Sequence, residues 1–160
     1  MKNYNVIQQA LQELFPNCPE TFALNFLALL EAPIEELATQ SIFILEKPYG
    51  RNHILIDQGD FGLSCAWLLP GRSTSLHYHN TREEFFCVRV GKVTLTSGTS
   101  VCNLHSLEHG KSIPGIPHSL ANSGIQPAEV LEVFAPAILD DKCRISDPYA
   151  RRIGKVGVSE

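Results

Sequence analysis

The order of hydrophobic and polar residues divides the chain into a helical first part and a β-rich remainder. Over residues 5–15, apolar side chains recur at steps of three and four, which predicts an amphipathic helix that Pro16 ends. A second apolar stripe predicts a helix that starts near Glu20 and stops near Ala32. A short helical turn is expected over 34–38, after which the pattern changes character.

From residue 41 onward the pattern is that of β-strands. Short runs rich in β-branched and aromatic residues are separated by Gly, Pro, Asn and Asp, at the spacing of an all-β barrel or sandwich. We therefore expect a mainly β fold, with a helical N-terminal extension over 1–40, a barrel over 41–153 and a loose tail over 154–160. The predicted strands cover residues 41–45, 54–57, 63–69, 84–90, 92–97 and 129–134.

The strongest chemical signal lies between Gly71 and Gly91. His77 and His79 are separated by one residue, so on a strand both side chains point to the same face while Tyr78 points away. Glu84 follows after a loop, and a carboxylate there can return toward the two imidazoles on the next strand. Gly91 permits a tight turn after that strand. This spacing indicates a metal site.

A fourth metal ligand has to come from another part of the chain. Pro114 and Gly115 predict a turn, and Pro117 keeps the approach to the following strand extended. His118 would then open that strand with its side chain pointing inward. We therefore expect His118 to join His77, His79 and Glu84 around one divalent ion.

Composition and charge exclude several other classes of protein. The 160 residues suit one domain, and the net charge of −4 comes without a block of like charges. We expect no nucleic-acid partner, no spanning helix and no secretion signal. The five cysteines form no Cys-x-x-Cys pair, which favours free thiols in a reducing cytoplasm, with Cys65 and Cys87 as small core residues. A small molecule or another protein chain is the expected partner.

These spacings resemble the two sequence motifs of the cupins. The first motif is carried by Gly71, His77, His79, Glu84 and Gly91, and the second by Pro114, Gly115, His118 and Asn122. Cupins are small antiparallel jelly-roll barrels, and many hold Mn, Fe, Zn, Ni or Co through three histidines and one glutamate. The resemblance implies one divalent transition metal in this chain.

A second resemblance, from residue 47 to residue 151, is to the cupin domain of type II phosphomannose isomerases. It rests on the segment 131–151, on Lys-Pro-Tyr-Gly at 47–50, and on residues within the first motif. It implies a metal-dependent aldose–ketose isomerase that acts on a sugar or a sugar phosphate. The implied catalytic residues are Glu84, Arg144 and Lys47, and the implied substrate-binding residues are Arg151, Arg82 and Tyr49.

The sequence also departs from that family. The family usually has Gln at the position of His77, Trp at those of Tyr49 and Phe86, and Gly at that of Ala150. The nucleotidyltransferase domain that often precedes this cupin is replaced by the helical extension, so we expect no nucleotide-sugar synthesis.

Several alternatives stay open. An Fe(II) dioxygenase and a non-catalytic metal- or sugar-binding module fit the same ligand set. Arg144 and Arg151 either bind an anionic substrate or form salt bridges with nearby aspartates. A homodimer is possible. The catalytic base is undetermined, with candidates at Glu83, Tyr78, Lys47, His105 and His109.

Overall fold

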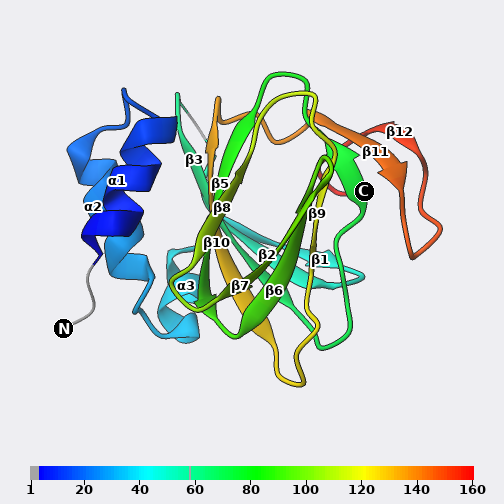
Figure 1. Ribbon diagram of the computed structural model, residues 1–160, viewed down its shortest axis with the longest axis horizontal. Helices are drawn as coiled ribbons and strands as arrows, with labels where there is room; N and C mark the ends of the chain where they lie inside the picture. Colours follow the sequence, from blue (N-terminus) through cyan, green and yellow to red (C-terminus); the bar gives the residue numbers. More distant parts are fainter. Residues whose placement is uncertain (1–3, 58) are drawn as a thin grey trace.

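The computed structural model describes residues 4–57 and 59–160, in which three helices precede a β-rich body (Figure 1). The backbone at Pro19 and Pro33 is extended, and a helix begins directly after each of these prolines. In the described part of the chain, no helix is long and apolar enough to cross a membrane. The helices are α1 (Asn5–Leu14), α2 (Glu20–Leu29) and α3 (Ile34–Gln40).

The strands form two six-stranded antiparallel sheets, which confirms the mainly β fold. The first sheet has the order β1 (Phe43–Lys47), β2 (Gly50–Ile56), β3 (Gly62–Leu68), β10 (Ala128–Ala135), β5 (Glu83–Val90), β8 (His109–Ser112). The second sheet has the order β12 (Gly154–Val156), β11 (Lys142–Ser146), β4 (Leu76–Tyr78), β9 (His118–Ala121), β6 (Lys92–Ser97), β7 (Ser100–His105).

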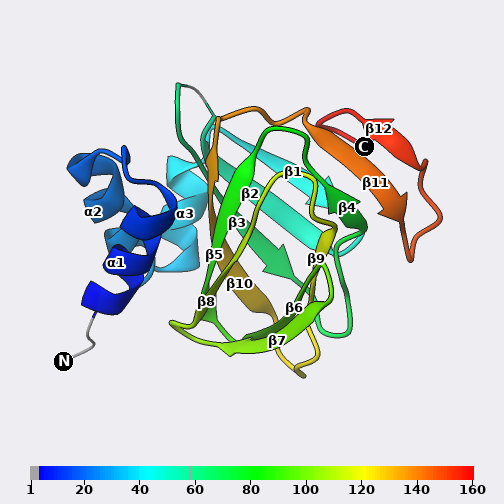
Figure 2. The same ribbon diagram turned by 45° about the horizontal axis from the view of Figure 1, so that its top comes forward.

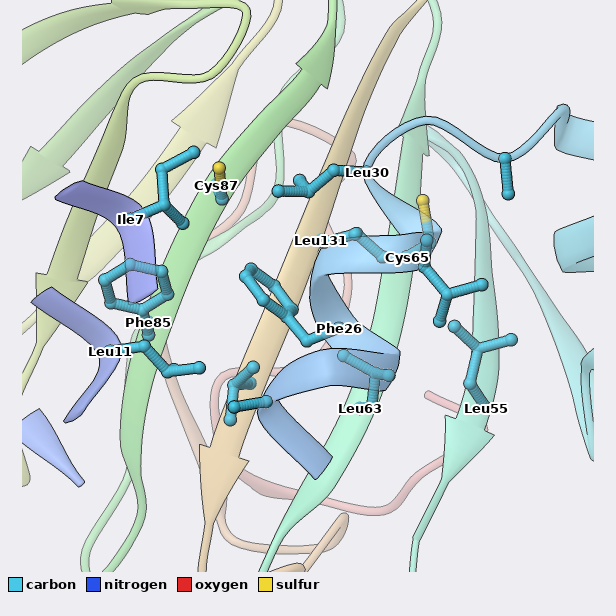
Figure 3. Close-up of a cluster of buried hydrophobic side chains, with 14 of the residues drawn as sticks. Ile7, Leu11, Phe26, Leu30, Leu55, Leu63, Cys65, Phe85, Cys87 and Leu131 are labelled. Atoms are coloured by element: carbon cyan, nitrogen blue, oxygen red, sulfur yellow. The ribbon is translucent and has the colours of Figure 1, made fainter. Parts of the chain in front are cut away.

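The middle strands of the first sheet are buried on both faces. The helices cover the outer face of this sheet, as Figures 1 and 2 show from two directions. In Figure 3 the ring of Phe26, from α2, lies among Leu63, Phe85 and Leu131 of β3, β5 and β10. Residues one step along these strands, such as Phe86, point to the inner face and belong to a second buried cluster. The apolar stripe of the helical extension is therefore covered by the chain's own sheet.

The structure adds short strands that the pattern did not predict. Residues 154–156, expected to lie in a loose tail, form β12 and pair with β11. His105 and His109, which lie outside the predicted strands, are the last residue of β7 and the first of β8. The unpredicted strands β8, β11 and β12 have only three to five residues each, so they are stabilised by pairing rather than by a long apolar run.

Candidate metal centre

The two sheets bring three buried imidazoles and one buried carboxylate together. His77 and His79 lie on β4, and His118 begins β9, where it is the register partner of His77. Glu84 comes from β5 of the opposite sheet. All four residues are at most 6% exposed, and one ring nitrogen of each histidine lies within 4.8 Å of those of the other two. Residues that are far apart in the sequence thus form one cluster.

Backbone carbonyls fix the orientation of all three imidazoles. The Nδ1 atoms of His77 and His118 lie 2.8 and 3.0 Å from the carbonyl oxygens of Ser75 and Ile116. The Nδ1 atom of His79 contacts the carbonyl oxygen of Asp141. A carbonyl only accepts hydrogen bonds, so each Nδ1 carries the proton and each Nε2 keeps its lone pair. Histidine ligands of metals have this arrangement.

The ionisation of the cluster also fits a cation. Burial lowers the pKa of His77 well below its ordinary value and lowers that of His79, which keeps both rings neutral. Burial opposes ionisation of Glu84, but Arg82, His79 and His118 hold its pKa well below the ordinary value. His118 differs, because burial lowers its pKa but the Glu84 carboxylate and the backbone at Ile116 outweigh this effect and raise it. Metal binding requires neutral imidazoles and an ionised carboxylate, so a metal would compete with the proton that His118 and Glu84 favour.

Two donor atoms in the cluster lack a well-formed hydrogen bond. Oε2 of Glu84 and Nε2 of His118 lie 2.6 Å apart, and both are buried without hydrogen-bond geometry. Burial of such atoms is costly unless another group satisfies them. A divalent ion would do so, and three imidazole nitrogens with one carboxylate oxygen suit Zn, Mn, Fe, Ni or Co. The residues present fit the implied metal.

A cavity extends from this cluster between the sheets in two connected parts. One part reaches His77, Glu84 and His118, and the other reaches Lys47 and Val158. Both parts are lined by Tyr49, Asn52, Arg82, Glu132 and Lys142.

Three of these lining residues were not singled out from the sequence. Glu132 could have been found by alternation, because it lies one step from the outward-facing Leu131 and Val133. Asn52 and Lys142 gave no comparable signal, since the strand predictions did not include their segments.

Comparison with known proteins identifies the family. A family model described as the C-terminal part of mannose-6-phosphate isomerase matches residues 35–147. The chain belongs to this family. It is 30% identical over 107 residues to a mannose-1-phosphate guanylyltransferase of Klebsiella pneumoniae, and 32% identical over 108 residues to the xanthan biosynthesis protein XanB of Xanthomonas campestris pv. campestris. Each match covers 66% of this chain but 23% of the relative, so the chain spans under a quarter of these proteins' length. The name of the Klebsiella relative contains a sugar phosphate, that of the Xanthomonas relative refers to xanthan biosynthesis, and neither names an isomerase.

Solved structures share the fold of this chain. Oxalate decarboxylase of Lactobacillus farciminis superposes with a TM-score of 0.58 at 22% identity, covering 64% of this chain and 33% of that one. The capsular polysaccharide assembling protein CapF of Staphylococcus aureus gives 0.58 at 19% identity, covering 66% and 32%. At these identities the likeness concerns the fold alone.

The residues implied by the family resemblance separate into two groups. Tyr49 and Lys47 line the cavity, where the Lys47 ammonium donates to the carbonyl of Val158 at 2.8 Å. Arg82 lies within the ligand cluster itself. Its Nε donates to Oε1 of Glu84 at 3.0 Å, and its guanidinium also reaches Nε2 of His79.

The other two arginines lie elsewhere. Arg144 is 1% exposed and does not line either part of the cavity. Its guanidinium donates to the carbonyl oxygens of Arg152 and Glu160 at 2.6 and 3.1 Å. Arg151 forms a two-pronged ion pair with Asp147, at 2.9 and 2.8 Å. Their positions favour the salt-bridge and structural alternative over substrate contact.

Asp141 is a further residue that supports the cluster. Besides its carbonyl contact with His79, its carboxylate accepts hydrogen bonds from the backbone N–H groups of Asn80, Thr81 and Arg82, and from the side chains of Asn80 and Thr81. This carboxylate therefore fixes the loop that joins β4 to β5. The loop connects His79 to Glu84, so its shape sets the distance between these two donors.

Replacing Asp141 with asparagine is expected to weaken metal binding by about tenfold. Loss of a residue that supports a metal ligand costs about 10- to 100-fold in metal affinity, so this is the lower end of that range. Burial opposes ionisation of this carboxyl, but the bonds from Thr81 and Asn80 lower its pKa from 3.8 to about 2. Because the folded-state pKa is depressed, the stabilisation is complete above pH 3.8 and is lost as the pH falls toward 2.

Metal titration and denaturation at a series of pH values check both parts of this prediction, with the exposed neighbour Asp140→Asn as control. The difference in free energy of unfolding between the wild type and Asp141→Asn should disappear as the pH falls from 3.8 toward 2. A gap that persists at pH 2 would contradict the assignment.

Proposed function

We propose that the protein is a metal-dependent isomerase that interconverts the aldose and ketose forms of a sugar phosphate. The observation that carries the proposal is the placement of four metal-type donors at one end of a cavity that is otherwise rich in cations. Arg82 and Lys142 line the middle of this cavity, and Lys47 lines its other part. Such a site suits a polar substrate with an anionic group.

The metal would be held by His77, His79, Glu84 and His118. When bound, it supplies a Lewis acid that stabilises negative charge on a substrate oxygen. Phe86 and Leu120 line the same end of the cavity and exclude water from it. Glu84 therefore acts as a ligand in this proposal, rather than as a separate acid or base.

The remaining cavity residues would orient the substrate. Oδ1 of Asn52 is buried without a hydrogen-bond partner among the described residues, so a sugar hydroxyl could donate to it. Lys47 would bind the phosphate. The free space in each part is about 40 Å³, close to the volume of one or two water molecules. A sugar phosphate therefore enters only if side chains that line the cavity shift.

The test is a panel of aldose and ketose phosphates, incubated with protein loaded separately with each of the five candidate metals. We expect interconversion of one substrate pair, followed by NMR, and its loss after chelation. Absence of turnover with the whole panel would overturn the proposal. Oxygen consumption by the Fe(II) form would instead indicate a dioxygenase, and sugar binding without product would indicate a binding module.

A further inference from the structure

Glu132 and Lys142 line the cavity but belong to neither the ligand cluster nor an ion pair among the described residues. Glu132 lies on β10 between its register partners Ser64 and Phe86, with its side chain on the inner face. Lys142 begins β11 in the opposite sheet. Both line the cavity at the end that reaches His77, Glu84 and His118. The fold thus places an acid and a base on opposite walls, beside the candidate metal centre.

Neither side chain has the ion pair or the several hydrogen bonds that a charged group with a purely structural role usually has. The carboxylate of Glu132 accepts one hydrogen bond, from Oγ of Ser64 at 3.1 Å, and has no ion-pair partner among the described residues. Within the same part of the chain, the Lys142 ammonium forms no hydrogen bond and no ion pair. By contrast, Glu129, also on β10, pairs with Arg89 at 2.8 Å. Both residues are partly buried, and a charge that is withdrawn from water without a partner is costly, so a function is needed to explain them.

We propose that Glu132 and Lys142 are the proton-transfer pair of this site, with Glu132 acting on the substrate carbons and Lys142 on the substrate oxygens. This inference rests on the proposed isomerase function and names its acid and base. It replaces the five earlier candidates for the base. Tyr78 and Glu83 alternate with His77 and Glu84 and so point to the other faces of their strands, and neither lines this cavity.

The electrostatic surroundings bring both groups close to neutral pH. Burial and the neighbouring Glu84 raise the pKa of Glu132 to about 7, against the opposing effects of Arg82, Ser64 and Lys142. Burial, Arg82 and Lys47 lower the pKa of Lys142 to about 8, against Glu84 and Glu132. Proton transfer is most efficient when the pKa of the acid or base lies near the working pH.

The proposed reaction returns both groups to their starting states. The Glu132 carboxylate takes the proton from C2, the C–H electron pair forms the C1=C2 double bond, and the carbonyl oxygen on C1 takes a proton from the Lys142 ammonium. The hydroxyl on C2 then gives its proton to the Lys142 amine, and its electrons form the new carbonyl. The double-bond electrons take the proton from Glu132 at C1. No oxidant or further reactant is required.

The experiment compares Glu132→Gln and Lys142→Met with the wild-type protein under the conditions of the isomerase panel. Matched controls are Glu83→Gln and Lys111→Met, which change charges outside the cavity. Acid–base groups contribute about 100- to 10,000-fold to rate, so we expect turnover to fall within that range in both cavity variants, and metal affinity to stay unchanged. The controls should keep wild-type turnover.

The pH profile supplies a second readout, which a structural role would not change. Wild-type turnover should follow a bell-shaped pH profile, because the reaction needs an ionised Glu132 and a protonated Lys142, and Lys142→Met should lose the alkaline limb. If Glu132→Gln keeps wild-type turnover, or if this variant no longer binds metal, the inference is overturned while the isomerase proposal stands. A wild-type protein that isomerises no sugar phosphate would overturn both, and the wild-type control identifies that case.

Discussion

Replacing His118 with alanine is expected to abolish metal binding at the candidate centre and, with it, isomerase turnover. His118 links the two halves of the cluster, because it is paired with His77 across β4 and β9 and lies 2.6 Å from the Glu84 carboxylate. Loss of residues that merely support a ligand costs about 10- to 100-fold in metal affinity. Loss of a ligand should therefore cost more than about 100-fold.

Calorimetric titration and metal analysis after dialysis measure this effect. The wild type should bind one ion per chain, and His118→Ala should retain none after dialysis. His105→Ala is the matched control, since His105 is exposed at the end of β7 and lies outside the cluster. Thermal unfolding of the metal-free proteins separates loss of the site from loss of the fold. One tightly bound ion in His118→Ala would exclude the four-donor site.

Sequence spacing was sufficient to predict the helices and the ligand cluster. Prolines mark the starts of α2 and α3, and the predicted helices agree with α1, α2 and α3 to within a few residues. His77 and His79 share a face because they alternate on one strand, which any β-strand guarantees. Glu84 and His118 follow from turns at defined positions. The helices and the shared face of His77 and His79 depend on neighbours in the sequence, so the sequence reveals them. That Glu84 and His118 join this pair depends on distant strands, and the resemblance to the cupin motifs indicated it.

The remaining parts of the cavity depend on contacts between distant segments. Lys142 faces Glu132 only because β11 and β10 belong to opposite sheets, and no periodicity in either segment indicates that pairing. Arg144 illustrates the same limit. The family resemblance implied a catalytic role for it, whereas its two terminal guanidinium nitrogens donate to backbone carbonyls near the end of the described chain and its Nε is buried without a hydrogen-bond partner among the described residues. Residue type and motif position did not show whether the Arg144 side chain lines the cavity.

Replacing Arg89 with methionine is expected to cause the largest loss of stability, because this residue joins the helical extension to the sheet. Its guanidinium lies 2.8 Å from the Glu129 carboxylate, donates to the carbonyl of Leu29 at 2.9 Å, and also reaches the carbonyl of Ala32. Those carbonyls lie at the end of α2, where helices leave acceptors unsatisfied.

Methionine would leave Glu129 buried without its cation. Breaking a buried ion pair from one side costs about 3–5 kcal/mol, which is a large part of the ~5–15 kcal/mol of a typical domain. The double variant Arg89→Met/Glu129→Met should recover much of this loss, because it removes the unpaired charge together with its partner. Denaturant unfolding measures each free energy.

The matched control for this prediction is Arg51→Met. Arg51 lies 3.9 Å from Glu46, and their side chains are 44% and 77% exposed. Exposed pairs contribute about 0–1 kcal/mol, so this variant should unfold almost like the wild type. The metal centre gives a further check, since Arg89 lies on the helix-facing side of β5 and Glu84 on its inner side. Arg89→Met should therefore bind metal with wild-type affinity as long as it remains folded. If this variant loses metal binding while it is still folded, the helical extension also supports the metal centre.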